Sequence, residues 1–194
     1  MKLNSNTEIV GHNILLVPYR ENHVPKYHEW MKSEDLQKLT ASEPLTLDEE
    51  FEMQKSWRED EDKCTFIILD KSIYDQINNE IESMIGDTNI FIVDQEYAIG
   101  EIEIMIAEPS ARGKKLGWEA VILMLLYGIQ YIQLKVFEAK ISLSNEISIN
   151  MFKKLGFQEK SRSEIFQEIT LEKEVSMEWI EWLSKEVQYK IKSC

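Results

Sequence analysis

The sequence predicts an α+β fold, built on a mixed, mostly antiparallel sheet with a central parallel β-α-β crossover flanked by helices. Three observations support this prediction. Residues 100–107 alternate between polar and apolar side chains, as a half-buried strand does. A broad apolar stripe with helical spacing follows over 115–131. A second alternating segment, 136–143, completes a strand–helix–strand unit, which is expected to cross over right-handed and to place two strands in parallel.

The residues before the crossover predict further strands and two helices. Pro25 suits the first turn of a short helix, and Thr46 with Glu49 matches a capping box at the start of another. The polar segment 71–83 is expected to form a surface loop or an added helical turn. Strands are predicted at 13–18, 64–70 and 84–93, the last of which turns at 94–96 into the strand at 100–107.

The residues after the crossover predict a capped helix and a hairpin. Asn145 is expected to cap a helix over 146–155, and Gly156 to end it in a left-handed conformation. A final amphipathic helix is expected over 175–191. The length fits one domain, 1–194, in which 175–194 form a C-terminal helix and tail. The hairpin strands are expected at 157–160 and 165–172.

The composition bounds the class of protein. Hydrophobic residues make up 43% of the chain and charged residues 29%, which is typical of a soluble globular protein. The start of the chain lacks the apolar run of a secretory signal, and no apolar stretch is long enough to span a bilayer. We therefore expect a cytoplasmic protein with no membrane association. Cys64, Cys194 and the three histidines show no spacing typical of a disulfide framework or a metal site.

The net charge of −13 argues against nucleic acid as a partner, because phosphates attract a basic surface. An acidic protein instead favours a cationic substrate such as a protonated amine, through long-range steering. The alternative is that the acidity serves solubility alone.

The loop between the central strand and helix is basic and contains two glycines. Unpaired N–H groups and a partial positive charge at a helix N-terminus attract anions, and glycine lets an anion approach the backbone closely. The loop is therefore a candidate cradle for a pyrophosphate, and the alternative is an ordinary strand-to-helix turn on a basic surface patch. Its residues are Arg112, Gly113, Lys114, Lys115, Leu116 and Gly117.

This loop resembles the acetyl-CoA-binding motif of the GNAT superfamily of N-acetyltransferases, Arg or Gln, any, any, Gly, any, Gly or Ala. Arg112 and Gly117 match that frame, whereas Lys115 replaces the first glycine. Residues 145–157 resemble a second GNAT signature, Asn-x-x-Ser/Ala ending in Gly-Phe. The segments KLNSNTEIVGHNILLVPY, YHEWMKSEDLQKLTASEPLTLDEEFEMQ and DKCTFIIL resemble the N-acetyltransferase 9 family, so the likeness covers nearly the whole chain.

The resemblance implies the GNAT acyl-CoA N-acyltransferase fold, with acetyl-CoA as a cosubstrate and no metal. It implies that Glu101, the first choice, or Glu103 deprotonates the acceptor amine through water. The alternative is that one or both face solvent or pair with lysines on a neighbouring strand. It also implies that the loop 39–44 lines the acceptor groove, and the alternative is a plain connection between two helices. The cofactor-binding residues it implies are Met105, Ile106 and Ala107, whose backbone N–H groups would lie beside the thioester if the strands splay there, with the six loop residues at 112–117 and Asn145.

Two positions depart from the family pattern. Lys115 costs on the order of 1 kcal/mol more than glycine if its φ must be positive. Phe152 stands where many GNAT enzymes have a tyrosine that protonates the leaving thiolate.

The leading hypothesis is acetyl-CoA-dependent acetylation of a protein amine, in particular a protein N-terminus, with tubulin as the acceptor that the resemblance implies. The alternatives are a weak or inactive GNAT-fold protein that binds a partner such as microtubules, and an enzyme that acetylates small polyamines.

Overall fold

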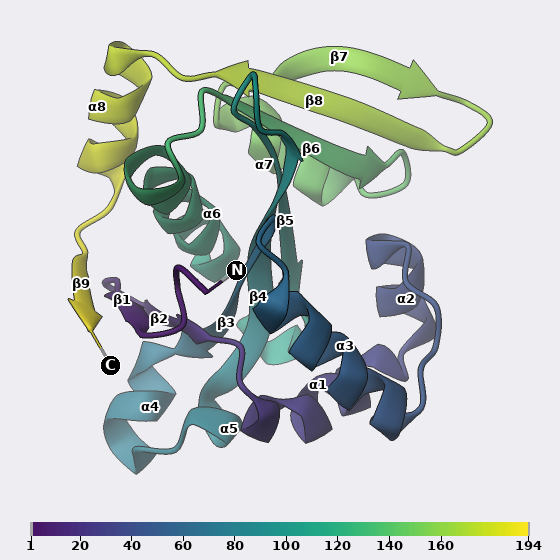
Figure 1. Cartoon of the computed structure of the whole chain (residues 1–194), viewed down its shortest axis with the longest axis vertical. Helices are drawn as coiled ribbons and strands as arrows, with labels where there is room; N and C mark the ends of the chain where they lie inside the picture. The colour runs from purple at the N-terminus through teal and green to yellow at the C-terminus, as the bar shows by residue number, and fades with distance from the viewer. Residues whose placement is uncertain (1, 194) are drawn as a thin grey trace.

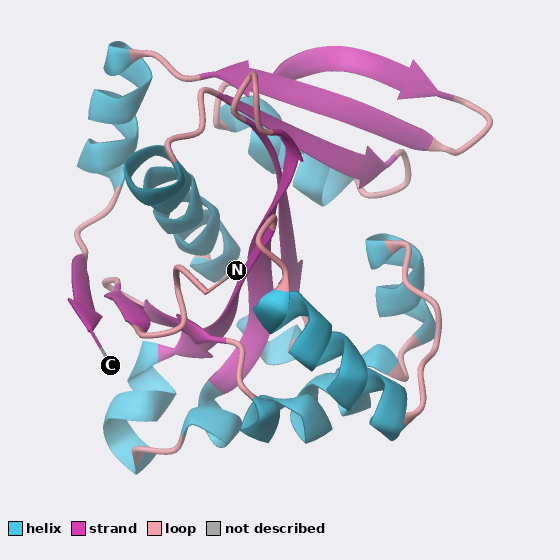
Figure 2. Ribbon diagram, viewed as in Figure 1, coloured by secondary structure: helices cyan, strands magenta, loops and turns pink. Residues whose placement is uncertain are grey.

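A nine-stranded sheet forms the centre of the computed structural model, which describes residues 2–193 (Figures 1 and 2). The strand order is β7-β8-β6-β5-β4-β3-β2-β1-β9. Within the described residues β5 and β6 pair in parallel, and every other neighbouring pair is antiparallel. The strands are β1 (Thr7–Val10), β2 (Ile14–Pro18), β3 (Lys63–Asp70), β4 (Met84–Asp94), β5 (Ile99–Ile106), β6 (Val136–Ser142), β7 (Gln158–Ser163), β8 (Glu168–Glu174) and β9 (Lys190–Ser193).

Helices cover both faces of this sheet (Figure 1). Residues of α6, α7 and α8 belong to the hydrophobic cluster on one face, and residues of α1 to α5 belong to or pack on the cluster on the other. The alternation along β5 explains the division, because Ile102 joins the first cluster and Met105 the second. The helices are α1 (Val24–Met31), α2 (Glu34–Thr40), α3 (Leu47–Glu59), α4 (Lys71–Ile77), α5 (Glu80–Ser83), α6 (Leu116–Tyr127), α7 (Glu146–Lys154) and α8 (Met177–Glu186).

The predicted crossover is confirmed, since β5, α6 and β6 form it. Ten of the twelve residues of α6 are buried, so this helix is enclosed on all sides rather than along one stripe. A helix that is hydrophobic around its whole circumference is expected to be buried in this way. The helix ends earlier than predicted, and a π-helical segment at Gly128–Ile132 follows it.

The predicted helix caps are confirmed. The Thr46 side chain accepts a hydrogen bond from the Glu49 N–H, and the Glu49 carboxylate accepts one from the Thr46 N–H, which completes the capping box of α3. The Asn145 side chain accepts from the Ser148 N–H at 3.1 Å and so caps α7. Gly156 has φ +92°, the left-handed conformation expected after the end of this helix.

The predicted helix over 175–191 is wrong beyond Glu186. The last residues form β9, which pairs antiparallel with β1 at the edge of the sheet. Val187, Tyr189 and Ile191 contact the core with a period of two, which is the spacing of a strand. The expected terminal tail therefore adds a strand, while Cys194 lies outside the described residues.

Other expectations were incomplete. The strand β1 and the helix α2 were not predicted, and α2 includes the first two residues of the loop expected at 39–44. The segment 71–83 forms two short helices, α4 and α5, rather than a surface loop or one added helical turn. Asp70 caps α4 by accepting hydrogen bonds from the N–H groups of Ser72 and Ile73, which explains why a polar segment becomes helical.

Candidate active site

The two parallel strands at the centre of the sheet separate along their length. β5 and β6 are in register only over Ile99–Val136, Gly100–Phe137 and Glu101–Glu138. Beyond Glu101, β5 continues to Ile106 without a registered partner on that side. The splay that the resemblance requires is therefore present, and it opens toward the C-terminal ends of both strands.

The backbone of β5 presents donors to this opening. The Ala107 N–H donates to the Ile85 carbonyl oxygen on β4 at 2.8 Å. In an antiparallel ladder successive N–H groups point to opposite sides, so the N–H of Ile106 points away from β4, toward the opening. Met105, opposite Asp87, shares the orientation of Ala107. Of the three residues expected beside the thioester, Ile106 alone directs its N–H there.

The N-terminus of α6 lies at the end of the same opening. Lys115 is its N-cap residue and makes no side-chain cap hydrogen bond. Glu119 is the first residue of α6 whose N–H donates to the carbonyl oxygen of Lys115, at 3.1 Å, so the N–H groups of Leu116, Gly117 and Trp118 have no acceptor within the helix. Three aligned amides at the positive end of a buried helix suit an anion.

Arg112 connects the loop to the end of β5. Its Nε donates to the Ile106 carbonyl oxygen at 2.9 Å and its second guanidinium nitrogen to the Ala107 carbonyl oxygen at 3.1 Å. The side chain therefore shapes the backbone of the predicted cradle. This anchoring role was not predicted, because a basic residue in such a loop is more simply interpreted as an anion ligand.

Two positions of the loop have left-handed backbones. Gly113 has φ +73° and Lys115 has φ +63°. From the sequence, Lys115 is expected to be strained if its φ must be positive. Its φ is positive, so a lysine is strained at this position. The side chains of Lys114 and Lys115 are exposed. Gly117 packs on Ile106, because a Cβ at this glycine would lie 3.2 Å from the Ile106 side chain.

Asn145 lies at the same end of the sheet as the loop. It follows β6 as the loop follows β5, and the C-terminal ends of two parallel strands point in the same direction. The two predicted GNAT motifs therefore flank one opening. The Asn145 side chain is the cap of α7 described above, which is the role that its position before a helix predicts.

The two candidate bases differ in their surroundings. Lys140 on β6 donates to Glu101 Oε2 at 2.6 Å, so Glu101 pairs with a lysine on a neighbouring strand, as the alternative predicted. Burial raises the pKa of Glu101, whereas Lys140 lowers it. Glu103 is 48% exposed and its ion pair with Lys63 is 3.9 Å long, too long for a hydrogen bond. Glu103 is the more accessible carboxylate of the two.

Phe152 is a core residue. It is 2% exposed and packs edge-on against Phe157, with ring centroids 5.0 Å apart. The position at which the GNAT resemblance implies a tyrosine therefore contributes hydrophobic packing here, and Phe152 has no proton to donate.

Asp87 on β4 was not predicted as a site residue. It is buried on the sheet face that carries Glu103, and its charge interacts with that of Glu103. The available signal was an aspartate within a largely apolar predicted strand, but the sequence does not reveal that helices would cover it.

The helix α1 is fixed to the end of β5 by Glu108. Trp30 Nε1 donates to Glu108 Oε1 at 2.8 Å, and the Lys26 ammonium lies 3.3 Å from the same oxygen. Glu108 thus positions α1 relative to the strand that carries the candidate bases.

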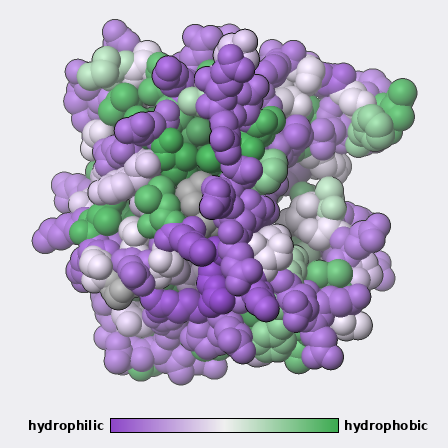
Figure 3. Space-filling view, in the orientation of Figure 1, coloured by the Kyte–Doolittle hydropathy of each residue, from purple (hydrophilic) through white to green (hydrophobic). Residues whose placement is uncertain are grey.

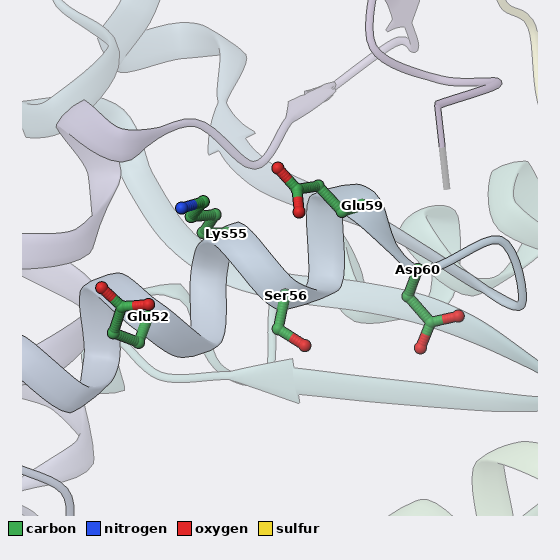
Figure 4. Close-up of a pocket in the computed structure, with 5 residues that line it drawn as sticks. All are labelled: Glu52, Lys55, Ser56, Glu59 and Asp60. Atoms are coloured by element: carbon green, nitrogen blue, oxygen red, sulfur yellow. The ribbon is translucent and has the colours of Figure 1, made fainter.

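A shallow depression lies on the outer side of α3, away from these residues (Figure 4). Its lining is polar and comes from one helix and its end, and it includes none of the predicted catalytic or cofactor-binding residues. It is lined by Glu52, Lys55, Ser56, Glu59 and Asp60.

Within residues 2–193, no helix is long and apolar enough to cross a bilayer. The same part of the chain contains no cluster of three or more histidine, cysteine, aspartate or glutamate side chains that could hold a metal ion.

The class of protein follows from the fold and the site together. The sheet arrangement, the splay of β5 and β6 and the free amides of α6 are those expected of a GNAT domain. The family model of the acetyltransferase (GNAT) domain matches residues 13–158. A domain from Methanocaldococcus jannaschii has the same fold, with a TM-score of 0.67 and 24% identity over 86% of this chain and 100% of that one. The spermidine N-acetyltransferase of Vibrio cholerae in complex with CoA and spermine has a TM-score of 0.71 and 15% identity, over 84% of this chain and 95% of that one. The chain is a GNAT N-acetyltransferase.

Full-length relatives define the family more narrowly. Alpha/beta-tubulin-N-acetyltransferase 9 of Drosophila melanogaster is 53% identical over 98% of this chain and 98% of its own. The human protein of the same name is 52% identical over 97% of this chain and 93% of its own. The chain therefore belongs to the N-acetyltransferase 9 family of GNAT acetyltransferases.

Proposed function

We propose that the protein transfers the acetyl group of acetyl-CoA to a protein amine, in particular an N-terminal α-amino group. The observation that carries this proposal is the opening between β5 and β6, which ends at the uncapped N-terminus of α6. A thioester lying along this opening would meet the N–H of Ile106, and the pyrophosphate would meet the amides of Leu116, Gly117 and Trp118.

The residues present fit acetyl-CoA as a substrate. Arg112 holds the ends of β5 and the loop together, while Lys114 and Lys115 add positive charge beside the helix N-terminus. Acetyl-CoA supplies the activated acetyl group, and the protein positions the two reactants and stabilises charge. Within this arrangement the left-handed Lys115 still presents its backbone to the phosphates, since its side chain is exposed.

The acceptor side is acidic. Glu101 and Glu103 share one face of β5, and the opening lies beside them. We propose that Glu103 contacts the acceptor amine, because the hydrogen bond from Lys140 holds Glu101 in an ion pair. Carboxylates in this position favour an ammonium ion over a neutral or anionic acceptor.

The groove for the acceptor chain is proposed between α2 and the β7–β8 hairpin. Figure 3 shows the surface hollowed between these elements, with hydrophobic residues at the tip of the hairpin. Ile165 is 89% exposed and Phe166 is 81% exposed at this tip. An apolar rim beside an acidic floor suits a polypeptide whose first residue carries the positive charge.

Tubulin is the proposed acceptor, and the cytoplasm the proposed location, because the relatives from fly and human are named alpha/beta-tubulin-N-acetyltransferases. The test is incubation of the purified protein with acetyl-CoA and unacetylated αβ-tubulin, followed by mass spectrometry of the tubulin N-terminal peptides. We expect a 42 Da increase on the N-terminal peptide. Spermidine serves as the comparison, and turnover on spermidine without turnover on any protein or peptide would contradict the proposal.

A further inference from the structure

Asp87 is a buried acid whose environment resembles that of a proton-accepting group. It is 4% exposed, and its Oδ1 atom has no hydrogen-bond partner among the described residues. Burial and then the charge of Glu103 raise the pKa of Asp87 to about 7, while Lys63 and a hydrogen bond from Asn89 act in the opposite direction. Catalytic acids and bases commonly have such shifted pKa values.

The sheet places Asp87 behind Glu103 as seen from the opening. Asp87 lies opposite Met105, and Glu103 lies opposite Asn89, so the two acids are diagonal neighbours on one face of adjacent strands. Diagonal neighbours in an antiparallel pair lie about 7–8 Å apart at their Cα atoms, within reach of two acidic side chains. The order across the sheet is therefore Asp87 on β4, Glu103 on β5, and the opening beyond β5.

Charged and titratable groups from several neighbouring elements interact with Asp87. The cation that lowers the pKa of Asp87 is Lys63, whose ammonium lies 3.9 Å from Glu103 Oε2 and 3.9 Å from the centroid of the Trp57 ring. Burial raises the pKa values of the Tyr19 and Tyr27 hydroxyls, so both stay protonated. The groups that interact with Asp87 are Glu103 on β5, Lys63 on β3, Tyr19 after β2 and Tyr27 on α1, and Glu50 on α3 acts on the same two tyrosines.

We propose, on the basis of the acetyltransferase function above, that Glu103 and Asp87 form a carboxylate pair that carries a proton away from the acceptor amine. Glu103 contacts the ammonium group and takes its proton, and Asp87 receives that proton from Glu103. The freed amine nitrogen attacks the thioester carbonyl carbon, so a C–N bond forms and the C–S bond breaks. The leaving thiolate takes the proton that the new amide nitrogen releases, and Asp87 returns its proton to solvent. This route requires no proton donor at Phe152.

The test measures kcat against pH with acetyl-CoA and a peptide that has a free α-amino group. The wild type is expected to lose activity as the pH falls through about 7, because protonated Asp87 cannot receive a proton. Asp87→Asn is nearly isosteric, and we expect it to lower kcat roughly 100-fold and to abolish this acid limb. A double variant of Asp87→Asn with Glu103→Gln is expected to lose no more activity than the more impaired single variant, because the two residues act as a unit.

The control is Glu138→Gln, which removes another buried carboxylate from the same sheet face. We expect it to keep kcat within about threefold and to retain the acid limb. An Asp87→Asn protein that binds acetyl-CoA normally, keeps the wild-type kcat and still loses activity as the pH falls through about 7 would overturn the inference. The proposed function would remain intact. Fully additive losses in the double variant would overturn it as well. A wild type that transfers no acetyl group to any amine would overturn both.

Discussion

Arg112 donates its Nε hydrogen bond to the carbonyl oxygen of Ile106, the last residue of β5, at 2.9 Å. The residue that matches the first position of the acetyl-CoA motif thus fixes the backbone from which the cofactor site is built. Because its guanidinium donates to backbone carbonyl oxygens, Arg112 fixes the position of the strand end. The exposed Lys114 and Lys115 instead contribute positive charge beside the helix N-terminus.

Arg112→Ala should weaken acetyl-CoA binding about tenfold, because hydrogen bonds from a charged group to the strand end are lost. Its affinity should keep the wild-type dependence on salt concentration. Lys114→Ala is the matched control, which should bind more weakly mainly at low salt, since an exposed charge is screened. Titration calorimetry at two salt concentrations measures both, and the reverse pattern would show that Arg112 contacts the phosphates directly.

Lys115→Gly should tighten acetyl-CoA binding roughly threefold, because glycine adopts φ +63° without strain and leaves the backbone open to the phosphates. Gln133→Gly is a suitable control, since Gln133 has φ +64° and lies outside the site. Both variants should show a similar change in melting temperature, and only Lys115→Gly should change the affinity. Weaker binding by Lys115→Gly would identify the lysine as a phosphate ligand.

Glu119→Ala should lower the free energy of unfolding by about 3 kcal/mol, because a buried carboxylate loses several hydrogen bonds at once. Glu119 Oε1 accepts from the N–H groups of His12 and Asn13 at 2.6 and 3.0 Å, which joins α6 to the turn between β1 and β2. Urea denaturation measures the change.

Gly11 offers a matched test of that contact. A Cβ at Gly11 would lie 2.3 Å from Glu119 Oε1, so Gly11→Ala should also destabilise the protein. In the double variant the second substitution should cost less than it does alone, because the clash disappears with the carboxylate. Additive losses would show that the two residues do not compete for the same space.

The buried Asp87 should make stability fall as the pH rises. Its pKa increases from 3.8 in the unfolded chain to about 7, so the folded state binds more protons than the unfolded state between these values. The free energy of unfolding should therefore decrease from pH 4 to pH 7, by up to about 4 kcal/mol from this group. Asp87→Asn should be more stable than the wild type at pH 8, and the difference should vanish near pH 4. A variant that is less stable at pH 8 would contradict this.

Local patterns predicted the central part of the fold. The alternation of β5 and β6, the apolar run of α6 and the caps at Thr46 and Asn145 depend on residues close together in the sequence. Each was found in the predicted segment, although α6 ends at Tyr127. The strands β1 and β9 were missed because each has four residues and is held by pairing with the other end of the chain. Such long-range pairing leaves a weak local signal.

The sequence predicted the parts of the site that belong to the two GNAT motifs, but not the side-chain contacts around them. The loop at 112–117 and the splay followed from the resemblance, whereas the anchoring of Arg112 on Ile106 depends on where a flexible side chain finds an acceptor. The role proposed for Asp87 arises from burial beneath α1 and α3, and burial is a tertiary property. The pairing of Glu101 with Lys140 likewise requires the register of β5 against β6, which the sequence does not specify.

The most direct measurement is a crystal structure of the protein with coenzyme A. The account predicts that the pyrophosphate lies against the N–H groups of Leu116, Gly117 and Trp118, with the thiol in the opening beside Ile106. A pyrophosphate bound elsewhere, or an α6 N-terminus covered by the Lys115 side chain in the presence of saturating coenzyme A, would contradict it.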